Sequence, residues 1–265
     1  MILQKLAAAS KKRAEKAKER IPLEEMKRLA YLAVEGSEKK NPPSLKQALS
    51  APGVSLICEI KRASPSKGLI SPEFPYLEIA KDYEQAGADA ISVLTEPEYF
   101  LGANEYLSRI HEQVSLPLLR KDFTVDPYQV YEAKAIGASA VLLICALLDT
   151  KELTEYLKIC ESLGLSALVE AHDEAEIHSA LSAGAKIIGV NNRNLKNFEV
   201  NFENSLRLRA MVPESVLFVA ESGIKTETDI RTLADAGVDG VLIGESLMRA
   251  PNKKELISRF QRASQ

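Results

Sequence analysis

The stretch of residues 58–68, which reads C-E-I-K-R-A-S-P-S-K-G, places a carboxylate and an ammonium group at the end of an apolar run. Alternate residues of a β-strand share a face, so Glu59 and Lys61 project to the same side. Two charges on one face of a buried strand are costly unless that face opens into a polar cavity. Pro65 and Gly68 then end the strand pattern. The stretch therefore predicts one wall of an active site.

Charged and polar residues also follow other apolar runs of the chain. These residues are Lys121, Glu170, Asn191, Arg193, Glu221 and Glu245. A structural network of ion pairs is the alternative interpretation, and it fits each residue taken singly. Two lysines, an arginine and the glutamates together exceed what pairing alone requires. We therefore expect them to converge on one catalytic pocket.

Small residues in the last two predicted loops indicate a phosphate site. Ser222-Gly223 and Gly244-Glu245 each follow an apolar run. Main-chain N–H groups can bind phosphate where small residues let its oxygens approach. The carboxylate of Glu245 must then point away from the phosphate.

The three histidines are scattered and show no His-x-x-x-His spacing, so we expect no metal site. His172 lies one residue beyond the expected inward position, and we interpret it as a loop residue rather than a catalyst. His111 and His178 fall in predicted helices and are interpreted as surface groups.

Eight apolar runs, each separated from the next by a longer helical pattern, predict the elements that position these residues. The runs are 54–61, 90–95, 116–121, 139–145, 165–170, 186–191, 216–221 and 240–244. They are rich in Val, Ile, Leu and Ala on both faces, as expected for parallel strands covered by helices.

A repeated glycine favours closure of these strands into a barrel. Gly87, Gly137, Gly184 and Gly237 each precede a predicted strand and follow a helical pattern. Glycine at that point supplies the left-handed turn that ends a helix. A (β/α)8 TIM barrel typically needs about 250 residues, which fits the chain. An open doubly wound sheet is the alternative, but the Gly-x-Gly-x-x-Gly expected after its first strand is absent.

Before the first strand, residues 1 to about 35 predict two helices separated near Ile21-Pro22, and Ser44 can cap a short helix through Leu49. We expect an N-terminal helical extension over residues 1–50, packed on a single catalytic barrel over residues 51–265.

Composition gives no reason to expect nucleic acid or membrane partners, because the net charge is −3 and no apolar run reaches the length of a membrane span. Cys58, Cys145 and Cys160 show no metal-binding spacing, and two of them lie in apolar runs. This usage is typical of a reducing compartment, so we expect a cytoplasmic protein.

Seven motifs resemble those of the indole-3-glycerol-phosphate synthase family over nearly the whole length. They are C-E-I-K-R-A-S-P-S-K-G (58–68), L-L-R-K-D-F (118–123), D-P-Y-Q-V-Y-E-A (126–133), L-V-E-A-H (168–172), G-V-N-N-R-N-L (189–195), A-E-S-G-I (220–224) and L-I-G-E-S-L-M (242–248). Asn194 and Asn201 stand where many members of the family have acidic residues, and neither is an expected catalytic group.

The resemblance implies decarboxylating and dehydrating ring closure of 1-(2-carboxyphenylamino)-1-deoxyribulose 5-phosphate, in tryptophan biosynthesis. Lys121 then acts as the general acid for ring closure. Glu170 is the base of the dehydration, and Lys61 with Glu59 forms its acid side. Lys61 can alternatively hold the carboxylate or phosphate of the substrate. No cofactor is implied, because loss of carbon dioxide restores the aromatic ring.

The resemblance also implies the groups that bind substrate. Asn191 and Glu221 bind hydroxyls and orient the lysines, and Arg193 can pair with a carboxylate. Pro65, Phe100 and Phe123 form an apolar slot for the aryl ring together with Leu142, for which a role in the core is nearly as plausible. The remaining expected contacts are Ser64, Ser66, Ser222, Gly223, Leu242, Gly244 and Glu245. We expect a monomer or weak homodimer.

Three other functions compete with this interpretation. A phosphosugar isomerase such as phosphoribosylanthranilate isomerase commonly uses a thiol and a carboxylate, but Cys58 has the opposite strand parity to Glu59 and is expected to face the helices. A Schiff-base aldolase would use Lys121 as its nucleophile. A phosphate-ligand-binding barrel without turnover would not need Lys121 and Glu170.

Overall fold

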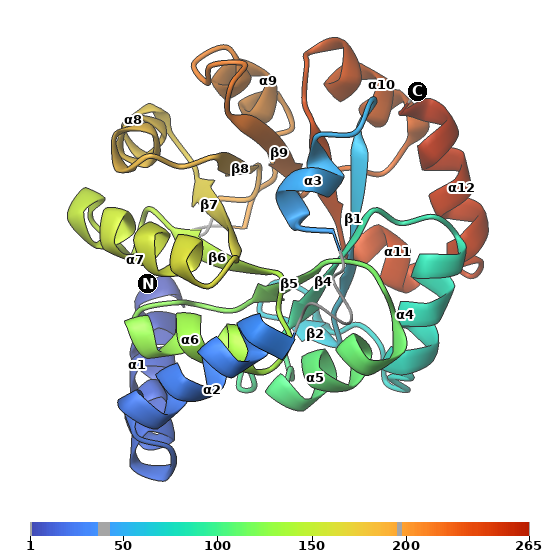
Figure 1. Cartoon of the computed structure of the whole chain (residues 1–265). Helices are drawn as coiled ribbons and strands as arrows, with labels where there is room; N and C mark the ends of the chain where they lie inside the picture. Colours follow the sequence, from blue (N-terminus) through green and yellow to red (C-terminus); the bar gives the residue numbers. More distant parts are fainter. Residues whose placement is uncertain (1, 37–42, 195–197, 265) are drawn as a thin grey trace.

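The computed structural model describes residues 2–36, 43–194 and 198–264, and its centre is a closed barrel of parallel strands (Figure 1). The strands are β1 (Ser55–Ile60), β4 (Ala90–Leu94), β5 (Leu118–Lys121), β6 (Ala140–Ile144), β7 (Ser166–Ala171), β8 (Ile187–Asn191), β9 (Leu217–Glu221) and β10 (Gly240–Ile243). Each pairs with the next in this order, and β10 pairs with β1, which closes the ring. The predicted TIM barrel is confirmed, and each strand end lies within two residues of its predicted place.

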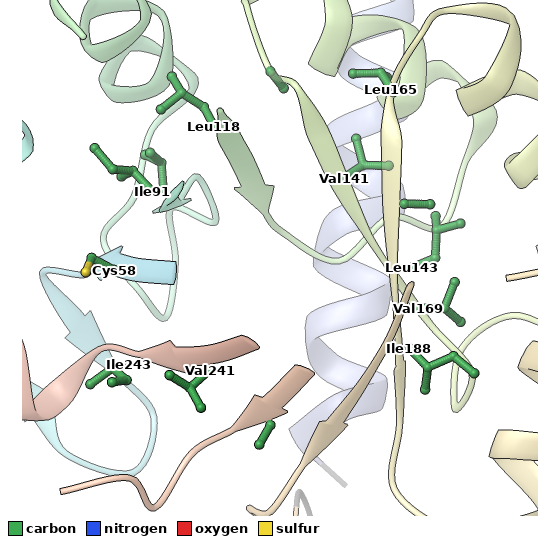
Figure 2. Close-up of a cluster of buried hydrophobic side chains, with 14 of the residues drawn as sticks. Cys58, Ile91, Leu118, Val141, Leu143, Leu165, Val169, Ile188, Val241 and Ile243 are labelled. Carbon is green, nitrogen blue, oxygen red and sulfur yellow. The ribbon is translucent and has the colours of Figure 1, made fainter. Parts of the chain in front are cut away.

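Helices alternate with the strands and surround the barrel (Figure 1). They are α4 (Tyr76–Gln85), α5 (Asn104–Gln113), α6 (Pro127–Ala135), α7 (Thr150–Ser162), α8 (Glu174–Ala183), α9 (Glu203–Arg209), α10 (Glu227–Asp235), α11 (Glu245–Arg249) and α12 (Lys253–Ala263). Outward side chains of the strands form the larger apolar cluster with these helices, and part of it is drawn in Figure 2. Cys58 belongs to this outer cluster, as its strand parity predicts. Ile57 lies in the separate cluster inside the barrel.

The repeated glycines have the predicted left-handed backbone. The φ angles are 90° at Gly87, 94° at Gly137, 91° at Gly184 and 74° at Gly237. A side chain is disfavoured at such angles, and glycine adopts them without strain. These four positions end α4, α6, α8 and α10, so the glycines direct the chain from each helix into its next strand.

Three helices precede the barrel, namely α1 (Ile2–Arg20), α2 (Leu23–Gly36) and α3 (Leu45–Leu49). The break between α1 and α2 lies at Ile21-Pro22, as predicted. Ser44 caps α3 in a reciprocal capping box with Gln47, which confirms the predicted cap. Leu45 and Leu49 of α3 are buried in the cluster inside the barrel, so α3 closes its N-terminal end.

Helix α1 is fixed to the segment that follows β5. Ser10 donates a hydrogen bond of 2.5 Å to the carbonyl oxygen of Phe123. Arg13 forms two hydrogen bonds, of 2.7 and 3.0 Å, with the carboxylate of Asp122. Since Asp122 and Phe123 directly follow Lys121, α1 is docked beside the expected active site.

The polar loop predicted after Lys61 contains a small hairpin, in which β2 (Ala63–Ser64) pairs with β3 (Gly68–Leu69). Strands of two residues have no periodicity to read in the sequence. The positive φ of 64° at Gly68 shapes the turn of this hairpin.

We predict that Arg13→Ala lowers the free energy of unfolding by about 1–3 kcal/mol at neutral pH, because it leaves a buried carboxylate short of its partner. Burial raises the pKa of Asp122, but Arg13, with Arg120 and Thr95, outweighs burial and holds this pKa below its ordinary value. The contribution is therefore present at neutral pH and is lost as the pH falls through the lowered pKa. Urea denaturation at several pH values measures it.

The control is Lys12→Ala, which changes an exposed residue of the same helix. Equal losses for the two variants would contradict the role of the pair.

Candidate active site

A cavity of about 680 Å³ lies at the C-terminal ends of the barrel strands. All six predicted catalytic residues and all twelve predicted substrate-binding residues line it. The structure thus brings together side chains that are up to 186 positions apart in the sequence, since Glu59 and Glu245 are both present (245 − 59). In a parallel barrel the carboxyl ends of all strands share one edge, and this shared edge explains the convergence.

Lys121 is the centre of the polar part of the cavity. Its Nζ lies 3.0 Å from Glu170 Oε2 and 3.0 Å from Glu221 Oε2. The three side chains are at most 13% exposed. With Glu59 they come from β5, β7, β9 and β1, which are alternate strands of the ring. Alternate strands contribute the side chains of one interior layer of a TIM barrel, so the uppermost layer here is charged.

Electrostatics within this layer fix the protonation of its members. Burial opposes a charge on Lys121, but Glu170 and Glu221 outweigh burial and raise its pKa. Burial also raises the pKa of Glu170, but Lys121 and His172 outweigh it and lower that pKa. Burial raises the pKa of Glu221 to about 7, with Glu170 adding to the rise. At neutral pH the site thus holds an ammonium group, an ionised carboxylate and a second carboxyl group whose pKa is raised above its ordinary value.

A second ion pair joins Lys61 and Glu59 on the wall formed by β1. Gly244 leaves room for it, because a Cβ at that position would overlap Glu59 Oε1 and lie 2.9 Å from Lys61 Nζ. Gly189 does the same for Glu221, whose Oε1 would overlap a Cβ placed on β8. Glycine at these two positions therefore leaves space for the carboxylates of Glu59 and Glu221. Sequence reasoning assigned Gly244 to phosphate and did not single out Gly189.

The residues predicted to bind phosphate lie together at the rim. Ser222 and Gly223 both have positive φ, of 67° and 85°, in the loop after β9. A serine in this region stores backbone strain, which persists mostly at functional sites. The Glu245 carboxylate lies 3.2 Å from Arg249 Nε and 3.6 Å from Lys67 Nζ. The Glu245 carboxylate is therefore ion-paired with both cations.

Apolar residues line another part of the cavity. The rings of Phe100 and Phe123 have centroids 6.1 Å apart, and Pro65 and Leu142 line the same cavity. Among the lining residues that the sequence analysis missed, three come from α1: Ile2, Leu3 and Leu6. Their spacing marks an apolar helix face, but sequence alone does not show what that face covers.

His172 lies closer to the polar cluster than its position in the sequence indicated. Its Nε2 atom is 3.4 Å from Glu170 Oε1, and its Nδ1 atom is 3.1 Å from Glu176 Oε2. The predicted loop position after β7 is correct, but the imidazole contacts the expected base. His111 lies in α5 and His178 in α8, as predicted, and His178 is exposed.

The thiol of Cys58 takes no part in this cavity. It is buried in the outer cluster, and burial raises its pKa. The thiol–carboxylate pair expected of an isomerase is therefore not formed by Cys58 and Glu59.

A closed barrel with a charged upper layer, an apolar slot and a rim of small residues defines a TIM-barrel enzyme acting on a small molecule. Solved structures share the fold at low identity. The 3-hexulose-6-phosphate synthase of Salmonella typhimurium is 14% identical with a TM-score of 0.66, and the alignment covers 79% of this chain and 98% of that one. A thiamine phosphate pyrophosphorylase from Pyrococcus furiosus is 17% identical with a TM-score of 0.62, covering 83% and 97%.

Sequence comparisons are more specific. The family model of indole-3-glycerol phosphate synthase matches residues 3–260. The indole-3-glycerol phosphate synthase of Ruminiclostridium cellulolyticum is 58% identical over 94% of this chain and 95% of its own length. That of Endomicrobium trichonymphae is 56% identical over 98% and 100%. The chain belongs to the indole-3-glycerol phosphate synthase family.

Family membership confirms the predicted activity. The chain is a decarboxylating lyase of tryptophan biosynthesis and acts on a phosphorylated small molecule. Across the described ranges, no helix is long and apolar enough to cross a membrane.

We predict that Gly189→Ala lowers kcat on the order of 10²-fold, as displacement of a positioned group by about 1 Å can do. The added methyl group moves Glu221 away from Lys121. Steady-state kinetics, with circular dichroism to verify folding, measure the effect. Gly36→Ala is the control, because no atom lies within 4 Å of a Cβ at that position. A kcat unchanged within a factor of two would show that the space at Gly189 is not needed to position Glu221.

Proposed function

We propose that the cavity at the C-terminal end of the barrel carries out the ring closure of 1-(2-carboxyphenylamino)-1-deoxyribulose 5-phosphate to indole-3-glycerol phosphate with Lys121 as the central acid. The observation that carries this proposal is the position of the Lys121 ammonium group, 3.0 Å from each of two buried carboxylates. The same cavity holds an apolar slot and a loop of left-handed residues.

In ring closure, the aryl carbon attacks the ketone while Lys121 protonates the ketone oxygen. The raised pKa of Lys121 supports an acid that is fully charged before substrate arrives. It also argues against a Schiff-base aldolase, because a lysine nucleophile needs a lowered pKa. Carbon dioxide then leaves, and the electrons of the broken bond restore the aromatic ring.

In dehydration, a base removes a proton from the ring-closed intermediate and an acid protonates the departing hydroxyl. Glu170 is the proposed base, supported by its lowered pKa, which keeps it ionised. Asn191 hydrogen-bonds the same carboxylate and helps to orient it. Lys61, paired with Glu59, is the proposed acid on the opposite wall. Lys61 can also hold the substrate carboxylate until that group departs.

Substrate binding is assigned by the chemistry of the lining. The aryl ring enters the slot of Pro65, Phe100, Phe123 and Leu142. Main-chain N–H groups near Gly223 and Gly244 take the phosphate, with Lys67 and Arg249 close by at the rim. Glu221 binds a hydroxyl group, and Arg193 pairs with a carboxylate. The other proposed contacts are Ser64, Ser66, Ser222, Leu242 and Glu245.

The broader organisation is also a proposal. Residues 1–50 form a helical extension and residues 51–265 the catalytic barrel. Three free cysteines support a cytoplasmic location. A monomer or weak homodimer is supported by the small number of large apolar residues that are exposed within the described ranges. These are Tyr31, Leu32, Leu69, Leu101 and Val200.

We predict that Lys121→Ala reduces turnover by at least about 10²–10⁴-fold, the usual contribution of one positioned acid. Ultraviolet detection of indole formation from synthetic substrate measures it, and circular dichroism verifies the fold. Lys186→Ala, which removes an exposed lysine just before β8, is the matched control. Undiminished product formation by Lys121→Ala would remove the assignment.

A further inference from the structure

Asn192 directly follows β8 and is buried behind the rim of the cavity. The residue is 3% exposed. Its neighbour Asn191 lines the cavity, whereas Asn192 lies outside the lining. The main-chain N–H of Asn192 donates a hydrogen bond of 2.9 Å to the carbonyl oxygen of Glu221, the last residue of β9. Asn192 is therefore held beside the loop that follows β9.

Both ends of the Asn192 side-chain amide form hydrogen bonds. Oδ1 accepts a bond of 3.0 Å from the main-chain N–H of Ser205 and one of 2.8 Å from its hydroxyl group. Nδ2 donates a bond of 3.1 Å to the carbonyl oxygen of Ser222. A main-chain N–H can only donate and a carbonyl oxygen can only accept, so these partners fix the orientation of the amide. Since Ser205 is a buried residue of α9, the amide ties Ser222 to that helix.

The carbonyl group of Ser222 sets the direction of the next N–H group. Ser222 has a φ of 67°, a backbone conformation that a residue with a side chain keeps only where its surroundings hold it. In a planar trans peptide, the carbonyl of one residue and the N–H of the next point in opposite directions. Asn192 holds the Ser222 carbonyl on the buried side, so the Gly223 N–H faces the other side. Gly223 lines the cavity, and its N–H has no acceptor among the residues that the structure describes.

We propose that Asn192 is a positioning residue for the phosphate group of the substrate: it holds the Ser222 carbonyl and thereby directs the Gly223 N–H into the cavity. A donor that is fixed before the phosphate arrives loses little conformational freedom on binding. Without Asn192, the peptide between Ser222 and Gly223 can rotate out of its strained conformation, and the N–H turns away from the phosphate. This inference rests on the proposed phosphate site in the loop after β9.

The variants Asn192→Ala and Asn192→Asp test different parts of the amide. Asn192→Ala removes both hydrogen-bonding ends and adds no charge. Asn192→Asp keeps an acceptor for Ser205 and loses the donor to Ser222, so it preserves the bond to α9 and keeps the test valid if Asn192→Ala does not fold. A purely structural role in holding α9 would leave Asn192→Asp with the properties of the wild type.

Asn204→Ala is the matched control. Asn204 Nδ2 also donates a hydrogen bond of 3.1 Å to a main-chain carbonyl oxygen, that of His172 after β7, and Asn204 lies outside the lining of the cavity. In steady-state kinetics, we expect both Asn192 variants to raise KM on the order of 10-fold and to keep kcat within about a factor of two, because one hydrogen bond that aids binding is lost. Asn204→Ala should keep both constants of the wild type.

Inorganic phosphate measures the site without catalysis. In protein labelled with ¹⁵N-glycine, the amide resonance of Gly223 should shift as inorganic phosphate is added to the wild type. The Kd from this titration should rise on the order of 10-fold in both Asn192 variants and stay unchanged in Asn204→Ala. Circular dichroism verifies that each variant is folded.

The outcomes separate this inference from the proposal on which it rests. If the Gly223 resonance of the wild type does not respond to excess phosphate, the proposed phosphate site is wrong and the role of Asn192 is wrong with it. If the wild type responds and the folded Asn192 variants keep its Kd, the phosphate site stands and the role of Asn192 alone is wrong. An equal rise of Kd in Asn204→Ala, or a fall of kcat with KM unchanged in the Asn192 variants, would also overturn that role.

Discussion

The buried Lys121 ammonium group between Glu170 and Glu221 is the interaction on which the rest of the site depends. Removing three ionisable groups from water is expensive, and the pair contacts of 3.0 Å offset that cost only if the geometry is held closely. The barrel provides this geometry, because alternate strands place their inward side chains in one layer. The same neighbouring charges that offset the cost of burial set the pKa directions of Lys121 and Glu170.

Residues without side chains are as important to this layer as the charged ones. Gly189 and Gly244 leave the volume that Glu221, Glu59 and Lys61 occupy. Helix α1 completes the enclosure, since it is tied through Arg13 to Asp122, next to Lys121, and contributes Ile2, Leu3 and Leu6 to the lining. Enclosure lowers the local dielectric, which strengthens each electrostatic contact.

The barrel and the convergence of its site were predictable because strand periodicity and strand ends are local features. Glu59 and Cys58 could be assigned to opposite faces from parity alone, and the repeated glycines marked the helix ends. Most of the missed features depend on how separate elements pack against one another. The contact of His172 with Glu170 depends on how α8 starts. The space that Gly189 leaves on β8 is needed by Glu221 of the neighbouring strand β9. The docking of α1 depends on Asp122, which is more than 100 positions away from Arg13. The hairpin of β2 and β3 was too short to have a pattern.

The central claim is that Lys121 delivers a proton to the ketone oxygen of a substrate whose phosphate is bound at the rim. The most direct measurement is a crystal structure with a substrate analogue in which the ketone is reduced to a hydroxyl, so that ring closure cannot occur. The account predicts this hydroxyl oxygen at about 3 Å from Lys121 Nζ, the aryl ring between Phe100 and Phe123, and the phosphate at the main-chain N–H groups near Gly223 and Gly244. A hydroxyl oriented away from Lys121, with another acid in contact with it, would contradict the account.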